Sequence, residues 1–262
     1  MTAAHKANDA DANRLDVLAV GAHPDDVELS VGGIICSFTA AGKRVGIVDL
    51  TRGELGTRGS PETREIEATR AAGILGAAVR ENLGIADGDI ANTRENQLRL
   101  IRVLRRYRPR IVLLNAPVCR HPDHGNAAQL GIDAAFFSGL SKIQTLDDGV
   151  EQEPWRPQHI LHYMQSVSFH PTFVVDVSAF WEQRMRALLA FESQFHVPLY
   201  KDAADEPETF VSNEGFLEWV SARAQAHGYP VGAKYGEPLL YHRGPIGIND
   251  LASVLARDRP FV

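Results

Sequence analysis

The chain has 262 residues, of which 44% are hydrophobic and 23% charged, and it carries a formal net charge of −6. This composition excludes disordered, collagen-like and coiled-coil chains, and an acidic chain offers no basic face to follow a nucleic-acid backbone. Two cysteines are too few for a disulfide framework and are usual in a reducing cytosol. No apolar run reaches the ~20 residues of a membrane span, and the polar start lacks a signal peptide's apolar core. We therefore expect a soluble, cytoplasmic protein with neither nucleic-acid nor membrane partners.

Strand and helix signals alternate through the first half of the chain. Apolar, β-branched runs that end at turns predict strands over residues 15–22, 44–51, 81–85 and 110–115. Helical patterns follow over residues 27–41, 60–75, 92–107 and 124–140. Ser60 caps the second helix, with Pro61 at its first position. This order predicts an α/β, Rossmann-like fold: a mostly parallel sheet with right-handed crossovers and helices on both faces.

Beyond residue 150 the pattern loosens. Strands are expected over residues 158–164 and 172–177, helices over 178–191 and 213–226, and an acidic surface loop over 202–208. No long linker separates these elements from the first half. We expect one domain over residues 15–262 with a loop-rich C-terminal cap, preceded by a polar extension over residues 1–14.

Two similar strings carry the chemistry of the chain: His23-Pro24-Asp25-Asp26 and His121-Pro122-Asp123-His124. Either string alone is typical of a turn, because proline and aspartate both favour turns. Each, however, follows a predicted strand and precedes a predicted helix. The first and fourth strands of a doubly wound sheet often flank the point where strand order reverses, and ligands bind outside the carboxyl ends there. The placement predicts one shared site.

Three of these residues form a metal-ligand set. His23, Asp26 and His124 supply two imidazoles and a carboxylate, which is usual for catalytic zinc and leaves a position for water. A divalent ion lowers the pKa of such a water to about 7. We therefore expect a metal site at the carboxyl end of the sheet.

The other members of the strings have candidate catalytic roles. Asp25, beside the ligand Asp26, is free to take the water proton as general base. His121 is close enough to donate to a developing oxyanion, and Asp123 would hold His121 in the right tautomer. Of the remaining histidines, only His170 is a further candidate to approach the site.

At these residues the chain resembles the LmbE-like, or PIG-L-like, zinc N-deacetylases. Both strings match the family's marks, and so do residues 49–59, 62–68 and 192–195. The resemblance runs from about residue 15 to 245. Within the family the chain is most similar to the bacillithiol-pathway deacetylases, which remove acetate from N-acetylglucosaminyl malate; residues 234–238 contribute to this assignment.

The resemblance implies zinc, or ferrous iron, on the three ligands named above, and a homo-oligomer that is often a hexamer. Arg64 matches an arginine that binds sugar hydroxyls, and Arg120 matches one near the aglycone. Guanidinium groups pair bidentately with carboxylates, of which malate brings two. The family's late tyrosine matches no single position, since Tyr200, Tyr229 and Tyr235 are all available.

The predicted function is a metal-dependent hydrolase that removes the N-acetyl group from an N-acetylglucosaminide, with N-acetylglucosaminyl malate as the expected substrate. An inositol-linked sugar and a free oligosaccharide are alternatives. So are a non-haem iron oxygenase with the same ligand set and a sugar-binding module with a structural metal. The glycine-rich loop over residues 53–59 lacks the Gly-Lys-Ser/Thr of a nucleotide-binding loop, and it is expected to shape the pocket rim.

Overall fold

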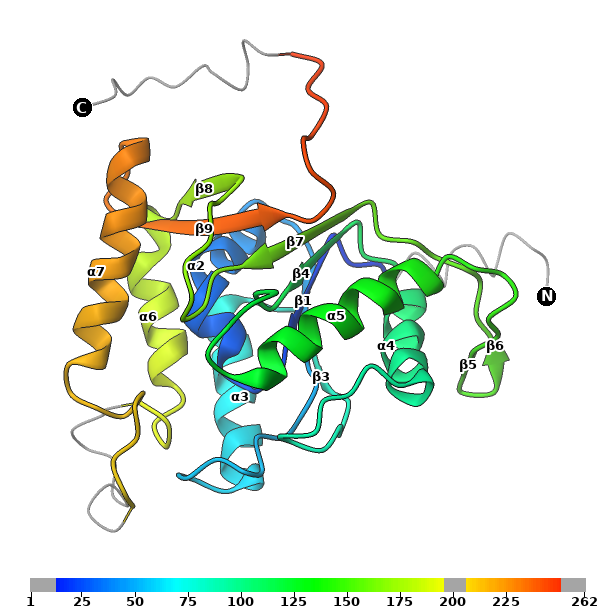
Figure 1. The fold of residues 1–262 in the computed structure, drawn as a ribbon, viewed down its shortest axis with the longest axis horizontal. Helices are drawn as coiled ribbons and strands as arrows, with labels where there is room; N and C mark the ends of the chain where they lie inside the picture. The colour runs from blue at the N-terminus through cyan, green and yellow to red at the C-terminus, as the bar shows by residue number, and fades with distance from the viewer. Residues whose placement is uncertain (1–12, 196–205, 251–262) are drawn as a thin grey trace.

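The structure, a computed structural model, describes residues 13–195 and 206–250. Seven strands form one sheet in the order β3-β2-β1-β4-β7-β9-β8 (Figure 1). The strands are β1 (Val17–Gly21), β2 (Val45–Asp49), β3 (Val79–Asn82), β4 (Ile111–Leu114), β7 (His159–Tyr163), β8 (Phe173–Asp176) and β9 (Gly236–Tyr241). Neighbours from β3 to β7 run parallel, and β9 is antiparallel to both of its neighbours. The predicted mostly parallel α/β fold is confirmed.

Helices cover both faces of the sheet (Figure 1). They are α2 (Asp26–Ala40), α3 (Pro61–Leu75), α4 (Arg94–Tyr107), α5 (Pro122–Phe137), α6 (Trp181–Leu189) and α7 (Phe216–Gly228), with short 3-10 turns η1 (Ser178–Phe180) and η3 (Tyr229–Val231). Side chains alternate along β1. Val17 and Ala19 join the apolar core under α2, α3, α6 and α7, whereas Leu18 and Val20 join the core under α4 and α5. The central strand is thus buried on both sides.

Two predicted boundaries are displaced. The third strand begins at Val79, two residues before the predicted start, because its register pairs Val79 with Gly46 of β2. Helix α5 begins at Pro122 rather than at residue 124, since His121 caps it and Pro122 is its first residue. The same cap-and-proline signal that located α3 was therefore present here. It places His124 in the first turn of α5.

The C-terminal part is more regular than a loop-rich cap. It adds β7, β8 and β9 to the main sheet and α6 and α7 to one face. Strand β9 was not predicted, because Pro238 lies inside it and a proline argues against an internal strand. The hairpin β5 (Leu146–Asp147) and β6 (Val150–Glu151) was also missed, although Asp148-Gly149 between its strands, both at positive φ, is a strong turn signal.

Some predictions fall outside the described residues. These are residues 1–12 of the N-terminal extension, and residues 196–205 with Tyr200 and the first part of the acidic loop. Within the described part of the chain, no helix combines the length and apolar character that a membrane span requires.

Candidate active site

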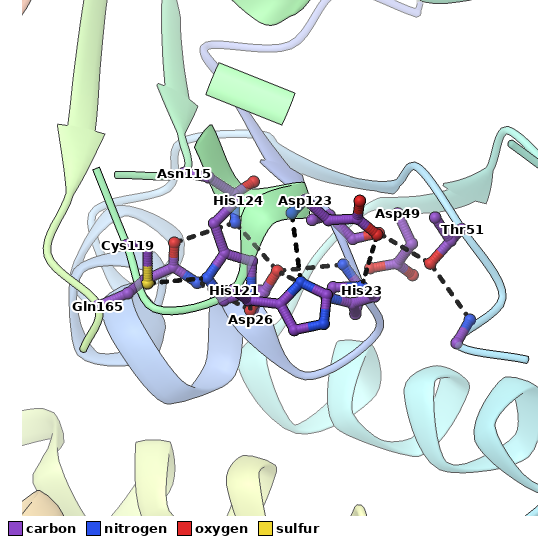
Figure 2. A network of polar contacts seen from close by, with 12 residues as sticks. His23, Asp26, Asp49, Thr51, Asn115, Cys119, His121, Asp123, His124 and Gln165 are labelled. Carbon is purple, nitrogen blue, oxygen red and sulfur yellow. Dashed lines mark hydrogen bonds and ion pairs between the residues drawn. The ribbon is translucent and has the colours of Figure 1, made fainter. Parts of the chain in front are cut away.

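Both His-Pro-Asp strings lie where the strand order of the sheet reverses. β1 pairs with β2 on one side and β4 on the other, so the carboxyl ends of β1 and β4 are neighbours. His23 follows β1, and His121 and His124 lie at the start of α5 after β4. The ring centroid of His23 lies 4.7 Å from that of His121 and 5.5 Å from that of His124 (Figure 2). The sheet thus brings the two strings together.

The Asp26 carboxylate lies between two imidazoles. Its Oδ2 is 3.7 Å from Nδ1 of His23, and its Oδ1 is 3.2 Å from Nε2 of His124. Two ligand atoms that share a tetrahedral ion at about 2.1 Å lie about 3.4 Å apart. Both separations are close to that distance, so the spacing of these donors fits a small divalent ion.

His23 also belongs to two further groups of candidate ligands. The donor atoms of His23, His121 and His124 lie within 4.8 Å of one another, and so do those of His23, Asp87 and Asp123. The second group uses the other ring nitrogen: Nε2 of His23 lies 3.0 Å from Asp87 and 3.4 Å from Asp123. A metal-binding imidazole commonly donates its second N–H to a carboxylate. This geometry suits an ion on the Nδ1 side of His23, with Asp87 and Asp123 as outer partners.

Carboxylates make the centre of the site attractive to positive charge. Burial lowers the pKa of His23, but hydrogen bonds with Asp123, Asp26 and Asp87 outweigh it and hold this pKa well above its usual value. Burial raises the pKa of Asp26, yet His124 and His23 hold it well below its usual range. A protonated imidazole or a divalent cation satisfies this demand.

Asp25 occupies a strained backbone position just before α2. Its φ of 116° lies in the left-handed region, where a non-glycine residue stores about 1–3 kcal/mol of strain. Burial raises the pKa of its carboxyl to about 7, with the charge of Arg64 opposing the rise and that of Asp26 adding to it. A carboxyl with a pKa near neutrality is suited to accept a proton at physiological pH.

His121 presents one nitrogen to the chain and leaves the other for the cavity. Its Nδ1 accepts a hydrogen bond from the backbone N–H of Asp123 at 3.3 Å, which assigns the ring proton to Nε2. Burial lowers the pKa of this imidazole, which favours the neutral form. The Asp123 carboxylate lies against His23 and accepts from Gly88 N–H at 2.8 Å. The contact of Asp123 with His121 therefore runs through the backbone, whereas the carboxylate was predicted to make it.

Arg64 lies buried in the wall of the same cavity. Its guanidinium donates to Gln194, and its Nε has no hydrogen-bond partner in the described part of the chain. A Cβ at Gly53 or Gly56 would lie 2.5 or 2.4 Å from a guanidinium nitrogen. The glycine-rich loop therefore wraps this side chain closely.

The other sequence candidates are placed differently. Arg120 is exposed and lines the cavity, with its guanidinium carbon 4.7 Å from the ring centroid of Phe210. His170, Tyr229 and Tyr235 are not among the described residues that line this cavity.

Sequence reasoning missed the polar residues that hold the ligands. Nε2 of Gln165 donates to Asp26 Oδ1 at 2.8 Å, and Oε1 of Gln165 accepts from Asn115 at 3.2 Å (Figure 2). Sγ of Cys119 lies 3.1 Å from Nδ1 of His124. A signal for Gln165 was available, because it follows β7, which runs parallel beside β4 and ends at the same edge.

The cavity itself has a volume of about 230 Å³. Its lining includes seven of the eight predicted site residues: His23, Asp25, Asp26, Arg64, Arg120, His121 and His124. Asp123 stands behind His23. Phe210, Phe216 and Trp219 from the C-terminal part also line the cavity.

Known proteins with similar sequences and structures bear on this site. A family described as PIG-L: GlcNAc-PI de-N-acetylase matches residues 18–135. The diacetylchitobiose deacetylase of Thermococcus kodakarensis is 35% identical over 193 residues, covering 68% of this chain and 70% of that protein. A probable N-acetyl-alpha-D-glucosaminyl L-malate deacetylase 2 of Bacillus anthracis is 25% identical over 227 residues, covering 79% and 96%. The crystal structure of a conserved protein of Thermus thermophilus matches with a TM-score of 0.77 and 37% identity, covering 90% of this chain and 98% of that one.

Proposed function

Since the chain belongs to the PIG-L family of de-N-acetylases, we propose that it is a metal-dependent deacetylase that removes the N-acetyl group from an N-acetylglucosaminide. One observation carries the proposal. Asp25 has a strained backbone and a carboxyl whose pKa burial raises to about 7, and it lies next to Asp26, whose carboxylate stands at metal-ligand spacing from His23 and His124. A purely structural ion has no use for an adjacent proton acceptor, whereas hydrolysis needs one for its water.

His23, Asp26 and His124 would hold the ion through two imidazole nitrogens and a carboxylate, a set that suits zinc, with ferrous iron as the alternative. When bound, such an ion lowers the pKa of a water and polarises the acetamide carbonyl. Gln165 and Cys119 hold Asp26 and His124 in orientation through the contacts described above.

The remaining residues of the site move protons. Asp25 takes a proton from the attacking water as the water oxygen adds to the acetamide carbon. The neutral His121 donates from Nε2 to the carbonyl oxygen as negative charge develops there. The proton that Asp25 accepted is then passed to the amide nitrogen, the C–N bond breaks, and acetate and the free amine leave.

Two aglycones have specific support. N-acetylglucosaminyl malate, the substrate predicted from the sequence, is supported by the name of the Bacillus anthracis relative and by Arg120, in the cavity lining, as a partner for carboxylates. A second sugar is supported by the name of the Thermococcus kodakarensis relative. In either case Arg64, whose charge opposes the rise in the pKa of Asp25, would contact the sugar that carries the acetamide.

The test is release of free amine by zinc-loaded protein from N-acetylglucosaminyl malate, diacetylchitobiose and plain N-acetylglucosamine. Release from at least one of them is expected, and activity without oxygen would exclude the oxygenase alternative. No release from any of the three would contradict the proposal and favour a binding module instead. The resemblance also implies a homo-oligomer, and light scattering on the same preparation measures the oligomeric state. A monomer would contradict that expectation.

Two substitutions test the roles of individual residues. Asp25→Asn is expected to retain the metal but to lower kcat by about 10²–10⁴-fold, because it removes the base. His124→Ala is expected to lose the metal as well as the activity, because it removes a ligand. Elemental analysis of the purified variants and amine release measure both properties. A near-wild-type rate for Asp25→Asn would show that Asp25 is not the base.

A further inference from the structure

The outer part of the cavity is aromatic. Phe210, Phe216 and Trp219, here called the aromatic rim, line it: Phe210 from the segment before α7, and Phe216 and Trp219 from the first turn of α7. The ring centroid of Phe216 lies 5.6 Å from that of Phe210 and 5.4 Å from that of Trp219, so Phe216 contacts both of the other rings. Phe216 is buried, but 57% of Phe210 and 38% of Trp219 remain exposed. Adjoining exposed rings at the mouth of a polar site are unusual on a surface without a ligand or partner.

Contacts from the catalytic loops hold Phe210 in place. The Arg120 guanidinium, next to His121, stacks on its ring. The segment that carries Phe210 is tied to the glycine-rich loop, because Glu206 accepts a hydrogen bond from Gly59 N–H at 2.8 Å and pairs with Arg58 at 3.3 Å. The ring is therefore held beside the acetamide site rather than on an independent loop.

Trp219 is connected to the same site through a second arginine. The Arg223 guanidinium lies 4.6 Å from its ring centroid, and Nη1 of Arg223 donates to the Gln165 carbonyl at 2.6 Å. Gln165 in turn donates to Asp26. Two of the three rings thus carry a stacked arginine that leads back to the candidate metal site.

The rim also has space for a ligand group. A second cavity of about 570 Å³ is bounded by the same three rings, together with Glu208, Thr209 and Asn213. The first cavity, about 230 Å³, lies below the ~300–1,000 Å³ that is typical of small-molecule sites. Both cavities are bounded by the three rings, so the rim borders open space beyond the acetamide site.

We infer that the aromatic rim binds a second pyranose ring, linked to the N-acetylglucosamine unit that is deacetylated. The inference rests on the proposed function and names its substrate class, a disaccharide or longer oligosaccharide. The C–H face of a pyranose complements the negative face of an aromatic ring, and the polar groups beside the rim match sugar hydroxyls. Glu208 is the one charged residue among the described residues that line the second cavity, and such a lining suits a neutral sugar better than a dianion such as malate.

The first test compares kcat/KM for diacetylchitobiose, N-acetylglucosamine and N-acetylglucosaminyl malate. The disaccharide is expected to exceed the monosaccharide at least about tenfold. Phe210→Ala is expected to reduce the disaccharide-to-monosaccharide ratio about three- to tenfold, mainly through KM, and Phe210→Tyr to preserve it, because the tyrosine keeps the ring face.

The control variant is Phe136→Ala. Phe136 is 48% exposed and carries a stacked guanidinium, that of Arg156, at 4.5 Å, but it lies on α5 outside the lining of both cavities. It should leave the ratio unchanged. A ratio near one in the wild type, or equal ratios in Phe210→Ala and the wild type, would overturn the inference. So would a preference for the malate compound that Phe210→Ala leaves intact.

A second test measures binding without turnover. Diacetylchitobiose titrated into metal-free protein should change tryptophan fluorescence saturably, and Trp219→Phe should abolish the change although Trp155 and Trp181 remain. Plain N-acetylglucosamine should cause no such change at the same concentrations, and an equal response to it would contradict the second-ring assignment. If the disaccharide binds in this way but no substrate releases amine, the proposed function is contradicted and the assignment of the rim to a second sugar ring is supported. If all substrates release amine equally and the fluorescence of Trp219 does not change, the proposed function is supported and the assignment of the rim to a second sugar ring is contradicted.

Discussion

At the scale of single residues, the two ring nitrogens of His23 face different carboxylates. Its Nδ1 faces Asp26 and its Nε2 faces Asp87 and Asp123. An imidazole whose second nitrogen is held by carboxylates is fixed in tautomer and orientation and becomes a stronger ligand. His124 shows the same division with a different partner, since its Nε2 faces Asp26 and its Nδ1 lies against the Cys119 thiol.

Cys119 is therefore expected to matter for metal binding rather than for proton transfer. Cys119→Ala removes the partner of His124 Nδ1, and we expect metal affinity to fall about 10–100-fold. Cys119→Ser keeps a polar partner there and should retain most of the affinity. Competition with a chromophoric chelator measures the difference, with Cys36→Ala, in the apolar core, as control. Equal affinities of Cys119→Ala and the wild type would show that the contact is incidental.

At the scale of elements, α2 is interrupted to present Asp26. Val31 departs from helical geometry, with φ −138° and ψ 17°, and divides the helix. The Glu237 carboxylate accepts hydrogen bonds from the N–H groups of Gly33 and Ile34 at 2.9 and 2.7 Å, which caps the second half. Arg184 donates to the Leu29 carbonyl of the first half. A strand and a helix from the C-terminal part thus stabilise a break in the helix that carries a candidate ligand.

Glu237→Gln is expected to destabilise the fold by about 3–5 kcal/mol, because it leaves the Arg184 guanidinium buried without its carboxylate. The shift of the urea unfolding midpoint measures this loss. Glu65→Gln, at a carboxylate with 75% of its side chain exposed, should change stability by less than about 0.5 kcal/mol. Coincident midpoints for the two variants would mean that the buried pair does not stabilise the interrupted helix.

At the scale of the whole molecule, the candidate site joins segments from most of the chain. Residues after β1, β3, β4 and β7 meet at one edge of the sheet, and the start of α7 with the segment before it lines the cavity from the C-terminal part. Several carboxylates meet at these strand ends. An ion bound among them would link the segments that carry them. Binding of the proposed metal would therefore be coupled to global stability.

Removal of the metal should consequently lower the melting temperature. A ligand at about 100 times its Kd stabilises the native state by about 2.7 kcal/mol, which for a chain of this size corresponds to about 5–10 °C. Thermal unfolding with zinc and with a chelator measures the change. His124→Ala, which lacks a proposed ligand, should melt at the same temperature in both conditions. A wild-type melting temperature that is insensitive to the chelator would contradict a tightly bound ion at this site.

Much of the fold could be predicted from the sequence because its signals are local. Apolar runs before turns located β1, β2 and β4, and the Ser60-Pro61 cap located the start of α3. The local signals failed where tertiary pairing outweighs propensity. Pro238 lies inside β9 because the strand is held between β7 and β8, and a proline gives no sign of that.

The sequence by itself determined the strand–helix order and the His-Pro-Asp strings behind β1 and β4, because residues close in the chain decide where a strand ends. Only the tertiary structure decided which distant side chains complete the site. Asp87 reaches His23 across 64 positions and Gln165 reaches Asp26 across 139, and the aromatic rim lines the same cavity from residues 210–219. Such contacts depend on strand order and helix packing, which bring together residues that no local pattern relates.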